Sequence, residues 1–432
     1  MRLVRTTLSA AAIWAAFSPG PACGSGYSIY EQGAAALGMA GAATASVGDA
    51  SALFFNPAAM TRLEGTRIYV GGSVLNPVTS FAGVDPYPGF GVTEEMKRQT
   101  FVPPTLYATH RYSSGWAVGA GLNSPFGLGT EWKKPDSFTG RYISTKAELR
   151  ALNGNLSGAY AFNSKWSVAA GASALFSKVR LENRIMAVYP GGGGEQVDVA
   201  RTKLESDYKP GYGWNTALSF APGKQWQLGA YYRSKVVVDV DDGSAEFRQI
   251  PTGDPQFDAA VAAGLPPDQT VSTVLRFPAM WSAGVSWLPR EAWTVEADFN
   301  FFEWSVFRDL PIRFKQTPEA NKTIPEDYDD SWQIRAGAEH RLPAYTYRFG
   351  YYFDRAAAPE ESVSPILPDS DRHGATLGFG RGFGPDKRWG VDVYELAIFV
   401  KKRSTENVNR DKFDGEYKTF VNAAGVGLAY RW

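Results

Sequence analysis

The chain has 432 residues, and its 44 Lys and Arg residues balance its 44 Asp and Glu residues, so the formal net charge is zero. This balance excludes the strongly basic character of nucleic-acid-binding proteins, and we expect no nucleic-acid partner. Aromatic residues make up 14% of the chain and 45 residues are glycine. A transmembrane β-barrel has such a composition, because only alternate residues of its strands meet lipid.

Residues 1–24 have the pattern of an export signal peptide. Arg2 and Arg5 precede an apolar run at residues 8–17, which is too short to span a bilayer as a helix. Small side chains then place the cleavage site after residue 24. The single cysteine, Cys23, would be removed with the signal. A lipoprotein anchor at Cys23 is the alternative, but no leucine stands three residues before it.

Residues 25–65 differ from the rest of the chain. They are rich in Ala and Gly and do not alternate, and residues 32–48 before Asp49 carry no charge. The segment is too short to fold alone. Its small side chains suit a segment that is packed inside another structure. A loose periplasmic tail is the alternative, against which the apolar cluster at residues 53–55 argues.

Residues 66–432 alternate between apolar and polar side chains with a period of two, which predicts β-strands. The clearest examples are residues 226–240, 275–287, 293–301 and 345–353. A soluble β-sandwich alternates in the same way. Many of the predicted strands exceed ten residues, however, whereas strands of soluble sheets have about five or six.

The connections between these strands alternate in length. Short turns are predicted near residues 113–115, 163–164, 221–223, 289–290 and 342–344. Long loops are predicted near residues 83–99, 130–145, 183–207, 242–271, 306–330, 355–371 and 403–418. Short turns at one end and long loops at the other are typical of bacterial outer-membrane barrels. The fold class is therefore all-β: a transmembrane antiparallel β-barrel of about fourteen strands in outer-membrane lipid, with residues 25–65 as a hatch inside the lumen.

The stretch at residues 121–132 begins as a strand and is then interrupted by Pro125, Gly127 and Gly129. Proline lacks the N–H that a strand needs, and glycine tolerates unusual backbone angles. A bulged or bent strand here would unpair from its neighbours. Unpaired backbone facing lipid must be shielded by protein or open onto a cavity. A strand that merely bends at the membrane edge is the alternative.

Two of the long loops carry apolar residues that either pack on their neighbours or contact a ligand. The first contains Ile185, Met186, Val188 and Tyr189. In the second, residues 254–265 predict a short helix with Asp254 as N-cap and Pro255 at the first position. One face of this helix carries Phe257, Val261 and Leu265.

The last predicted strand ends at the C-terminal residue, Trp432, with apolar residues on one face. A terminal aromatic resembles the assembly signal of outer-membrane barrels, so we expect contact with the barrel assembly machinery through Trp432. The preceding strand fits less well. Glu395 falls on its apolar face, and we expect a β-bulge near Tyr394 to reset the register.

The chain as a whole resembles the FadL/TodX outer-membrane transporters of long-chain fatty acids and hydrocarbons. The matching motifs are "FFNPAAM" at 54–60, "PFGLGTEW" at 125–132, "NLSGAYAFNSKWSVAAG" at 155–171, "FEWSVF" at 302–307 and "LPDSDR" at 367–372. The resemblance implies a fourteen-stranded barrel with a hatch whose motif is Asn56, Pro57 and Ala58. It also implies a third strand kinked inward at Pro125, Phe126 and Gly127, which leaves a lateral gap in the wall.

The resemblance implies passive uptake of long-chain fatty acids or similar hydrophobic compounds. Ligands would bind a groove between the two apolar loops and leave sideways into the bilayer through the gap, with Asn56 and Pro57 holding the hatch near it. The family's head-group arginine corresponds to Asn183 here, so Arg184 beside it and Arg180 become the candidates to pair with a carboxylate. Aromatic or alkane hydrocarbons are the alternative, because they need only an apolar pocket.

Two other functions fit the sequence less well. A general aqueous porin conflicts with the plug-like N-terminal segment. An enzyme would need catalytic groups, but none of the three histidines stands in a nucleophile motif. No cluster with metal-ligand spacing occurs, so we expect no catalytic residue, metal or cofactor.

Overall fold

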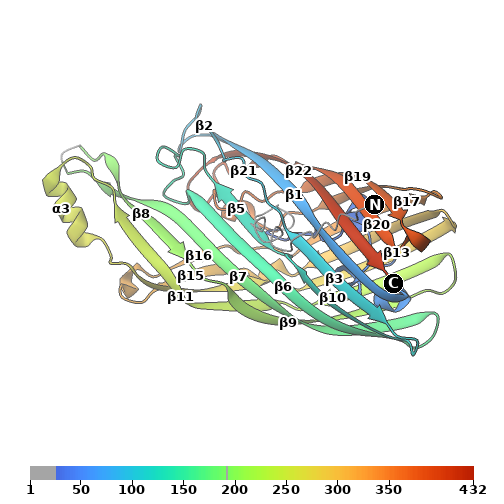
Figure 1. The fold of residues 1–432 in the computed structure, drawn as a ribbon. Coiled ribbons are helices and arrows are strands. Elements are labelled where there is room, and N and C mark those ends of the chain that lie inside the picture. The colour runs from blue at the N-terminus through green and yellow to red at the C-terminus, as the bar shows by residue number, and fades with distance from the viewer. Residues whose placement is uncertain (1–25, 191–192) are drawn as a thin grey trace, which may run out of the picture.

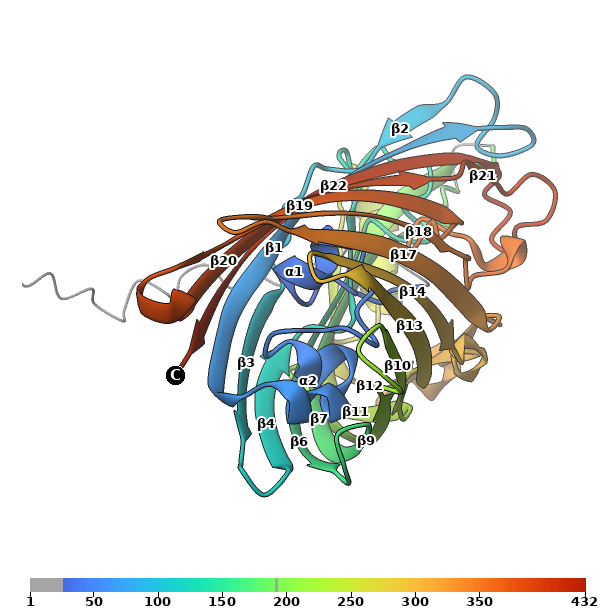
Figure 2. The same cartoon turned by 90° about the vertical axis from the view of Figure 1, so that its right-hand side faces the viewer.

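In the computed structural model of this protein, residues 26–190 and 193–432 are described, and the predicted signal peptide with Cys23 lies outside them. Within the described residues, fourteen strands close into an antiparallel barrel, as predicted (Figures 1 and 2). In spatial order they are β1 (Gly65–Gly83), β3 (Pro104–Arg111), β4 (Trp116–Asn123), β6 (Lys146–Ala161), β7 (Trp166–Val188), β9 (Lys209–Phe220), β10 (Trp226–Arg233), β13 (Met280–Arg290), β14 (Trp293–Phe302), β17 (Ser331–Arg341), β18 (Thr346–Asp354), β19 (Arg372–Phe383), β20 (Trp389–Val400) and β22 (Gly415–Arg431).

The barrel closes where β22 pairs with β1, from Arg67 opposite Arg431 to Gly83 opposite Gly415. Closure leaves neither the first nor the last wall strand as a free sheet edge, which a spanning sheet requires. Along β1 the exposed Val70, Val74 and Val78 alternate with buried side chains. The wall therefore turns an apolar face outward and a second face into the lumen.

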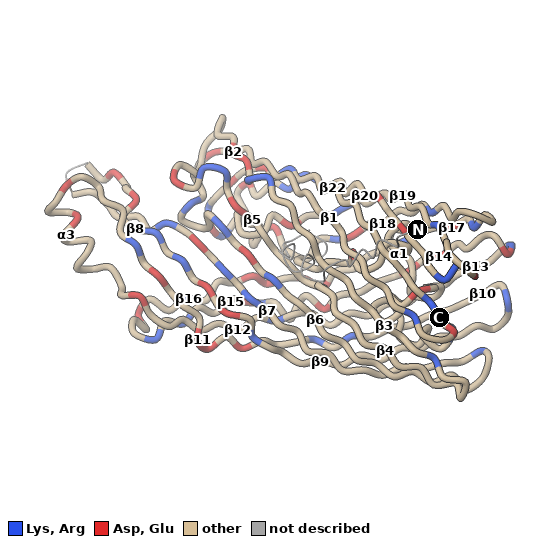
Figure 3. Tube along the Cα trace, viewed as in Figure 1, with Lys and Arg blue, Asp and Glu red and all other residues tan. Residues whose placement is uncertain are grey.

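Aromatic side chains mark both rims of this apolar wall. Beside the short turns the exposed aromatics are Trp116, Trp166, Trp226, Trp287 and Trp389. Toward the other end they are Tyr212, Trp214, Trp281 and Tyr351. Tyr and Trp favour membrane interfaces because their rings are amphipathic. Charged residues are dense over the segments 196–205, 236–249, 309–314 and 322–325 and at the turns (Figure 3).

One of eight further strands continues the third wall strand, and the other seven continue the wall beyond the outer rim or cross its mouth. They are β2 (Thr93–Glu95), β5 (Gly127–Glu131), β8 (Gln196–Glu205), β11 (Val236–Gln249), β12 (Gln269–Phe277), β15 (Asp309–Phe314), β16 (Lys322–Pro325) and β21 (Arg403–Ser404). The predicted loops at 183–207 and 242–271 are thus wrong in extent, because β7, β8, β11 and β12 occupy much of both. These segments extend beyond the lipid, so their outward positions carry charged residues. The apolar–polar alternation that predicts a membrane strand is therefore obscured in their sequence.

Two details of the turns also differ from the prediction. The turn expected at 289–290 lies at 291–292, since a register shift between Trp287 and Arg290 extends β13. The turn between β19 and β20 at residues 384–388 was not predicted.

The bulge expected near Tyr394 is also absent. β20 pairs without a register shift, with Glu395 opposite Leu377 and Ala424, and Tyr394 is buried in the lumen while Glu395 is exposed. Glu395 accepts a hydrogen bond from the side chain of Asn422. Keeping the strand in register retains the backbone ladder, and a polar partner on the same face accommodates the single acid.

Residues 26–63 lie inside the barrel and are almost entirely buried. They form α1 (Ala34–Gly38), α2 (Ala52–Phe55) and the 3₁₀ helix η2 (Pro57–Arg62), and Figure 2 shows α1 and α2 ringed by the wall strands. The other helices are α3 (Pro255–Gly264), η3 (Trp304–Val306), η4 (Pro318–Ala320), η5 (Glu360–Ser362) and η6 (Pro385–Lys387). None of the helices in the described ranges is long and apolar enough to cross a membrane.

Wall side chains hold this inner segment by its backbone. Asp298 accepts hydrogen bonds from the amides of Ala43 and Thr44 at 2.8 and 2.9 Å, and Arg335 donates to the carbonyl of Ala40 at 2.6 Å. The fit is close, since a Cβ added to Gly378 would lie 2.6 Å from Cα of Gly38. The Ala- and Gly-rich composition therefore matches a segment pressed against the wall.

Candidate functional site

The third wall strand is broken between β4 and β5. Asn123 lies opposite Asn153 and Gly127 lies opposite Arg150, so three residues of the broken strand face two residues of β6. This is a one-residue β-bulge, which moves later side chains to the other face of the sheet. Leu122 before the bulge is exposed, whereas Leu128 after it is buried in the lumen.

The bulge also changes the partners of the strand. β4 pairs with both β3 and β6, whereas β5 pairs with β6. On its other edge, among the described residues, β5 is met near its end by the bridge of Met96 with Trp132 and by the bond from Lys97 N–H to Glu131 O at 2.7 Å. The wall is thus unpaired beside residues 128–130.

At the bulge, the start of the inner segment, which is the predicted hatch, makes the backbone hydrogen bonds that a neighbouring wall strand would otherwise make. Ile29 N–H donates to Pro125 O at 2.8 Å, and Gly127 N–H donates to Tyr27 O at 2.9 Å. The side chain of Gln32 donates to Ser124 O at 2.8 Å. The freed backbone groups of the bulge are therefore satisfied by the hatch, not by the wall.

An aromatic cluster seals the bulge from the lumen side. Its members are Tyr27, Phe126, Phe277, Trp304 and Phe307. The ring centroid of Tyr27 lies 4.5 Å from that of Trp304 and 6.2 Å from that of Phe126, both edge-on. Edge-to-face pairs at such separations are favourable. The cluster joins the hatch, the broken strand and η3.

A cavity in the lumen lies directly behind β5. Its free volume is ≈ 60 Å³, and its lining comes from the hatch, the wall, the segment at 306–330 and the loop at 355–371, which we call the mouth loop. The lining residues are Tyr27, Leu128, Glu148, Leu149, Val179, Leu181, Leu275, Phe307, Leu310, Glu326, Tyr328, Ser362, Ser364, Ile366 and Leu367. We call this space the inner cavity. A second apolar cavity of ≈ 30 Å³ shares Val179, Leu181 and Leu310 with it and extends toward β12 and β15.

The mouth loop closes the inner cavity from outside and is tied to the broken strand. Thr130 donates to Ile366 O at 3.0 Å, and the indole N–H of Trp132 donates to Pro365 O at 3.3 Å. Within the loop, Asp369 accepts from Arg372 at 2.6 Å and both residues are buried. A small cavity of ≈ 20 Å³ lies between Gly129 and Thr130 of β5 and residues 96–99.

The hatch motif lies at a different part of the wall. Asn56 is fully buried, caps η2 by accepting from Ala58 N–H at 3.0 Å, and donates to Thr44 O and to Leu218 O of β9. Pro57 starts η2 and is also buried. The motif therefore braces the hatch against β9, and the hydrogen bonds to the bulge come from Tyr27, Ile29 and Gln32.

The two apolar loops come together beyond the barrel. The predicted helix at 254–265 is present as α3, with Asp254 capping the amides of Gln256 and Phe257. Tyr189 donates to Asp254 at 2.9 Å, and its ring meets that of Phe257 edge-on at 5.3 Å. These two contacts join the first loop to the second, whose helix α3 lies at the end of the molecule beyond β8 and β11 (Figure 1).

The remaining residues predicted to contact ligand fall into two groups. Ile185 and Leu265 pack against a small apolar cluster of β11, β12 and β15, and Val261 on α3 is partly exposed. Met186 and Val188 are exposed. The loops therefore present an apolar surface that is only partly covered.

Neither candidate arginine lies in the inner cavity. Arg180 alternates with the cavity residues Val179 and Leu181, so it points away from the lumen, and it pairs with Glu182. Arg184 is buried and pairs with Asp136 at 2.7 Å. Both assignments as carboxylate ligands stay predictions, and the geometry gives each arginine an acidic partner within the chain.

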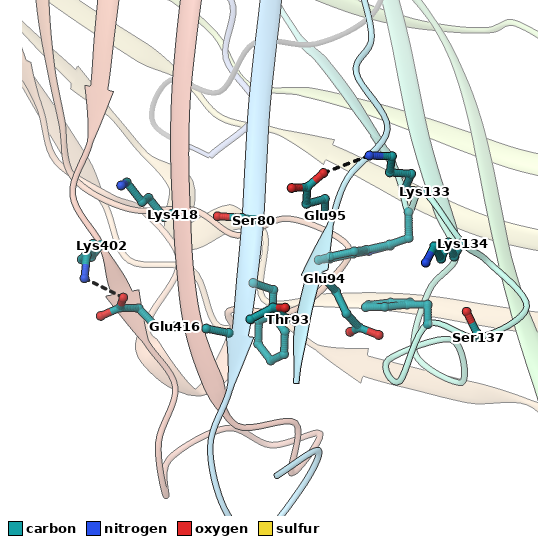
Figure 4. A pocket seen from close by; sticks show the side chains of 14 residues that line it. Ser80, Thr93, Glu94, Glu95, Lys133, Lys134, Ser137, Lys402, Glu416 and Lys418 are labelled. Carbon is teal, nitrogen blue, oxygen red and sulfur yellow. Dashed lines mark hydrogen bonds and ion pairs between the residues drawn. The ribbon is translucent and has the colours of Figure 1, made fainter. Parts of the chain in front are cut away.

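A wider pocket, of ≈ 560 Å³, lies elsewhere, between β1, β2, β22 and the loop after β5 (Figure 4). Its aromatic lining consists of Phe81, Trp132 and Phe138. Lysines at its rim face glutamates, as in the pairs of Lys133 with Glu95 at 3.1 Å and of Lys402 with Glu416 at 2.7 Å. None of the predicted ligand residues lines this pocket.

Sequence reasoning did not find several residues that build the site. Tyr27, Ile29 and Gln32 stand in an unpatterned segment, where no periodicity marks a contact. Trp304 and Phe307 belong to the motif "FEWSVF", so an unusual density of aromatics was the available signal. Glu326 gave no signal, because only the folded loop buries it.

Comparison with known proteins agrees with this architecture. The family model described as outer membrane protein transport protein (OMPP1/FadL/TodX) matches residues 15–432. A long-chain fatty acid transport protein of Escherichia coli is 24% identical over 453 residues, which cover 98% of each chain. The crystal structure of a Pseudomonas aeruginosa FadL homologue superimposes with a TM-score of 0.83 at 19% identity, covering 95% of this chain and all of the other.

A third relative has a different named substrate. The crystal structure of the toluene transporter TodX from P. putida superimposes with a TM-score of 0.71 at 17% identity, covering 93% of this chain and 99% of the other. At these identities the solved structures establish the fold, while the family model covers nearly the whole sequence. The chain belongs to the outer-membrane transport protein family OMPP1/FadL/TodX, and it is an outer-membrane transporter of hydrophobic compounds, not an enzyme.

Proposed function

We propose that the protein takes up long-chain fatty acids or similar hydrophobic compounds passively and releases them sideways into the outer membrane at the broken third strand. The ligand first meets the apolar surface formed by the loop at 185–189 and α3. It then passes to the inner cavity and leaves beside β5. An apolar molecule on this route never crosses water, so no energy source is needed for its release.

The observation that carries the proposal is the bulge at residues 124–126. It turns Leu128 into the inner cavity and leaves the edge of β5 unpaired beside residues 128–130. A break in a lipid-facing wall is expensive unless it serves a cavity. In our proposal the break connects the inner cavity with the lipid, and the residues that close it belong to the hatch and to the mouth loop.

The free volume of the inner cavity, ≈ 60 Å³, is far below the roughly 300 Å³ at which ligand sites begin. We therefore infer that the hatch shifts when ligand binds. Tyr27 is the part that moves, because it both lines the cavity and bonds to the bulge. Asn56, Pro57 and Ala58 would stay fixed on β9 as the anchor about which the segment moves.

The test is to straighten the third strand. Replacing Pro125→Val together with Gly127→Val restores an amide donor and favours extended backbone. In cells that lack their own transporter, we expect uptake of radiolabelled oleate to fall at least tenfold while the folded barrel remains at the surface, as shown by its heat-modifiable migration.

A matched control carries the same two changes where the wall is regular. Pro210→Val in β9 and Gly158→Val in β6, where an added Cβ meets nothing within 4 Å, should leave uptake unchanged. Normal oleate uptake in the Pro125 and Gly127 variant, with the barrel folded, would rule out the lateral route.

Uptake of aromatic or alkane hydrocarbons is the second candidate. It is favoured by one observation: no Lys, Arg or His is among the described residues that line the inner cavity. Uptake of toluene but not of oleate by the same cells would select it.

For assembly, we propose that the exposed residue Trp432, directly after β22, contacts the barrel assembly machinery.

A further inference from the structure

The inner cavity contains a carboxyl group, that of Glu326, which a purely apolar ligand would not need. Glu326 lies in the connection from β16 to β17, outside the membrane-spanning strands, and its exposed fraction is 8%. It lines the inner cavity beside Ser362 and Ser364 of the mouth loop. In the described part of the chain, no hydrogen bond or ion pair reaches its carboxylate; its backbone amide instead bonds to Arg308 O.

The charged groups around Glu326 come from its own connection and from the loop before β22. Asp327 beside it pairs with Arg410 at 2.7 Å, and Asp411 follows Arg410. Arg410 also donates to Pro325 O at 3.1 Å, so its guanidinium is already engaged. The charge of Arg410 lowers the pKa of Glu326, but by less than burial and the charge of Asp411 raise it.

The cavity itself offers Glu326 no positive charge. Its described lining contains no Lys, Arg or His. The only other acid there, Glu148, is paired with Arg150 and lies 3.9 Å from Lys146. Tyr27 faces Glu326 from the hatch, but its hydroxyl donates to Arg276 O at 3.0 Å.

This environment favours the uncharged form of the acid. Burial, and then the charge of Asp411, raise the pKa of Glu326 to about 8. At pH 7 the group is therefore mainly a carboxylic acid, with one O–H to donate. Because the carboxyl is largely buried and lines the cavity, a ligand oxygen there would accept its hydrogen bond.

We propose that Glu326 is the head-group contact of the inner cavity and donates, as an uncharged carboxyl, a hydrogen bond to the terminal oxygen of a long apolar ligand. The inference rests on the proposed uptake function and names the ligand chemistry of its inner site. A carboxylate is accepted only while Glu326 is protonated, because two negative charges would otherwise meet in an apolar cavity. An alcohol is accepted in both states, because its hydroxyl can donate to an ionised Glu326.

The experiment measures equilibrium binding to the purified full-length protein in detergent between pH 6.5 and pH 9.5. The probes are radiolabelled oleate, oleyl alcohol and 1-octadecene. For the wild-type protein we expect oleate affinity to fall as the pH rises through about 8, approaching tenfold per pH unit above it. The affinities for oleyl alcohol and 1-octadecene should stay constant.

Two substitutions separate the proton from the hydrogen bond. Glu326→Gln keeps a donor and cannot ionise, so its oleate affinity should lose the pH dependence. Glu326→Leu removes the donor, so at the lowest pH of the range both oxygenated probes should bind about five- to tenfold more weakly while 1-octadecene binds as before. Glu319→Gln, on the exposed η4, is the matched control and should behave as wild type.

An oleate pH profile of Glu326→Gln identical to that of the wild type would overturn the inference, as would equal weakening of all three probes by Glu326→Leu. Both results leave the uptake function standing, since the probes still bind. Failure of the uptake function has a different signature: no probe binds to any variant, and cells that express the folded barrel take up none of them.

Discussion

At the scale of single residues, the buried side-chain amide of Asn56 ties the hatch together. Asn56 uses its side chain three times, as cap to Ala58 N–H and as donor to Thr44 O and Leu218 O. No water reaches it, so each of these groups would be left without a partner if the side chain were removed. The position therefore needs a side chain that has an acceptor and two donor hydrogens at the reach of asparagine, and not merely a polar side chain.

We expect Asn56→Ala to loosen the hatch without opening the barrel. Loss of these bonds should cost about 1–3 kcal/mol of local stability, the penalty of unpaired buried groups. Amide hydrogen exchange in residues 40–63 should accelerate while the wall strands remain protected. Asn163→Ala, which removes a cap in an exposed turn, should leave the hatch amides unchanged. Unaltered exchange in residues 40–63 of the Asn56 variant would contradict this role.

At the scale of elements, the third strand illustrates both the reach and the limit of sequence reasoning. Pro125 with Gly127 predicts an interrupted strand, because neither residue supports a regular ladder. The sequence did not predict that the interruption is a one-residue bulge or that Tyr27 and Ile29 occupy its freed edge. Register and partner are set by β6 and by the hatch, which lie far away along the chain.

The helix α3 was predicted correctly because its signals are local. Asp254 and Pro255 mark its start, and Asp254 caps Gln256 and Phe257 as expected. Its packing against Tyr189 was not predictable, since it depends on how the two loops fold over each other. The same holds for Glu395, whose outward position follows from the unbroken register of β20.

We expect Asp254→Ala to detach α3 from the first loop. The backbone amide of Phe257, and then Tyr189, hold the pKa of Asp254 below its ordinary value near 4. A depressed pKa stabilises the folded form at higher pH, so this cap is present at neutral pH and is lost as the pH falls through that lowered pKa. Limited proteolysis at pH 7 should cut residues 250–268 faster in the variant. The control Asp241→Ala, on β11, should be cut as wild type; equal cutting of the Asp254 variant would refute the prediction.

At the scale of the whole molecule, the closed wall and the filled lumen together decide what can pass. Pairing of β1 with β22 closes the wall, and residues 26–63 occupy the space that an aqueous channel would need. Transport must then use the apolar cavities and the break in the wall. The absence of net charge fits a protein whose ligands are steered by burial and not by a long-range field.

We expect low single-channel conductance in planar bilayers for the intact protein. Deleting residues 28–63 should raise the conductance severalfold, because the lumen of a fourteen-stranded barrel is then open to water. Heat-modifiable migration shows whether the deletion variant is folded, and Asn56→Ala provides an intermediate that keeps the full chain. A folded deletion variant with unchanged conductance would mean that the mouth loop, not the hatch, closes the lumen.

The sequence by itself determined the fold class, the number of wall strands, the position of the broken strand and the helix of the outer loop. Each of these follows from signals within some twenty residues: period-two alternation, turn residues, proline and helix caps. The tertiary structure alone decided which groups meet. It placed Tyr27 and Ile29 on the bulge, turned Arg180 outward, engaged Arg184 with Asp136 and buried Glu326 in the inner cavity. Burial and charge environment arise only when segments hundreds of residues apart come together in a closed barrel, and no local pattern encodes them.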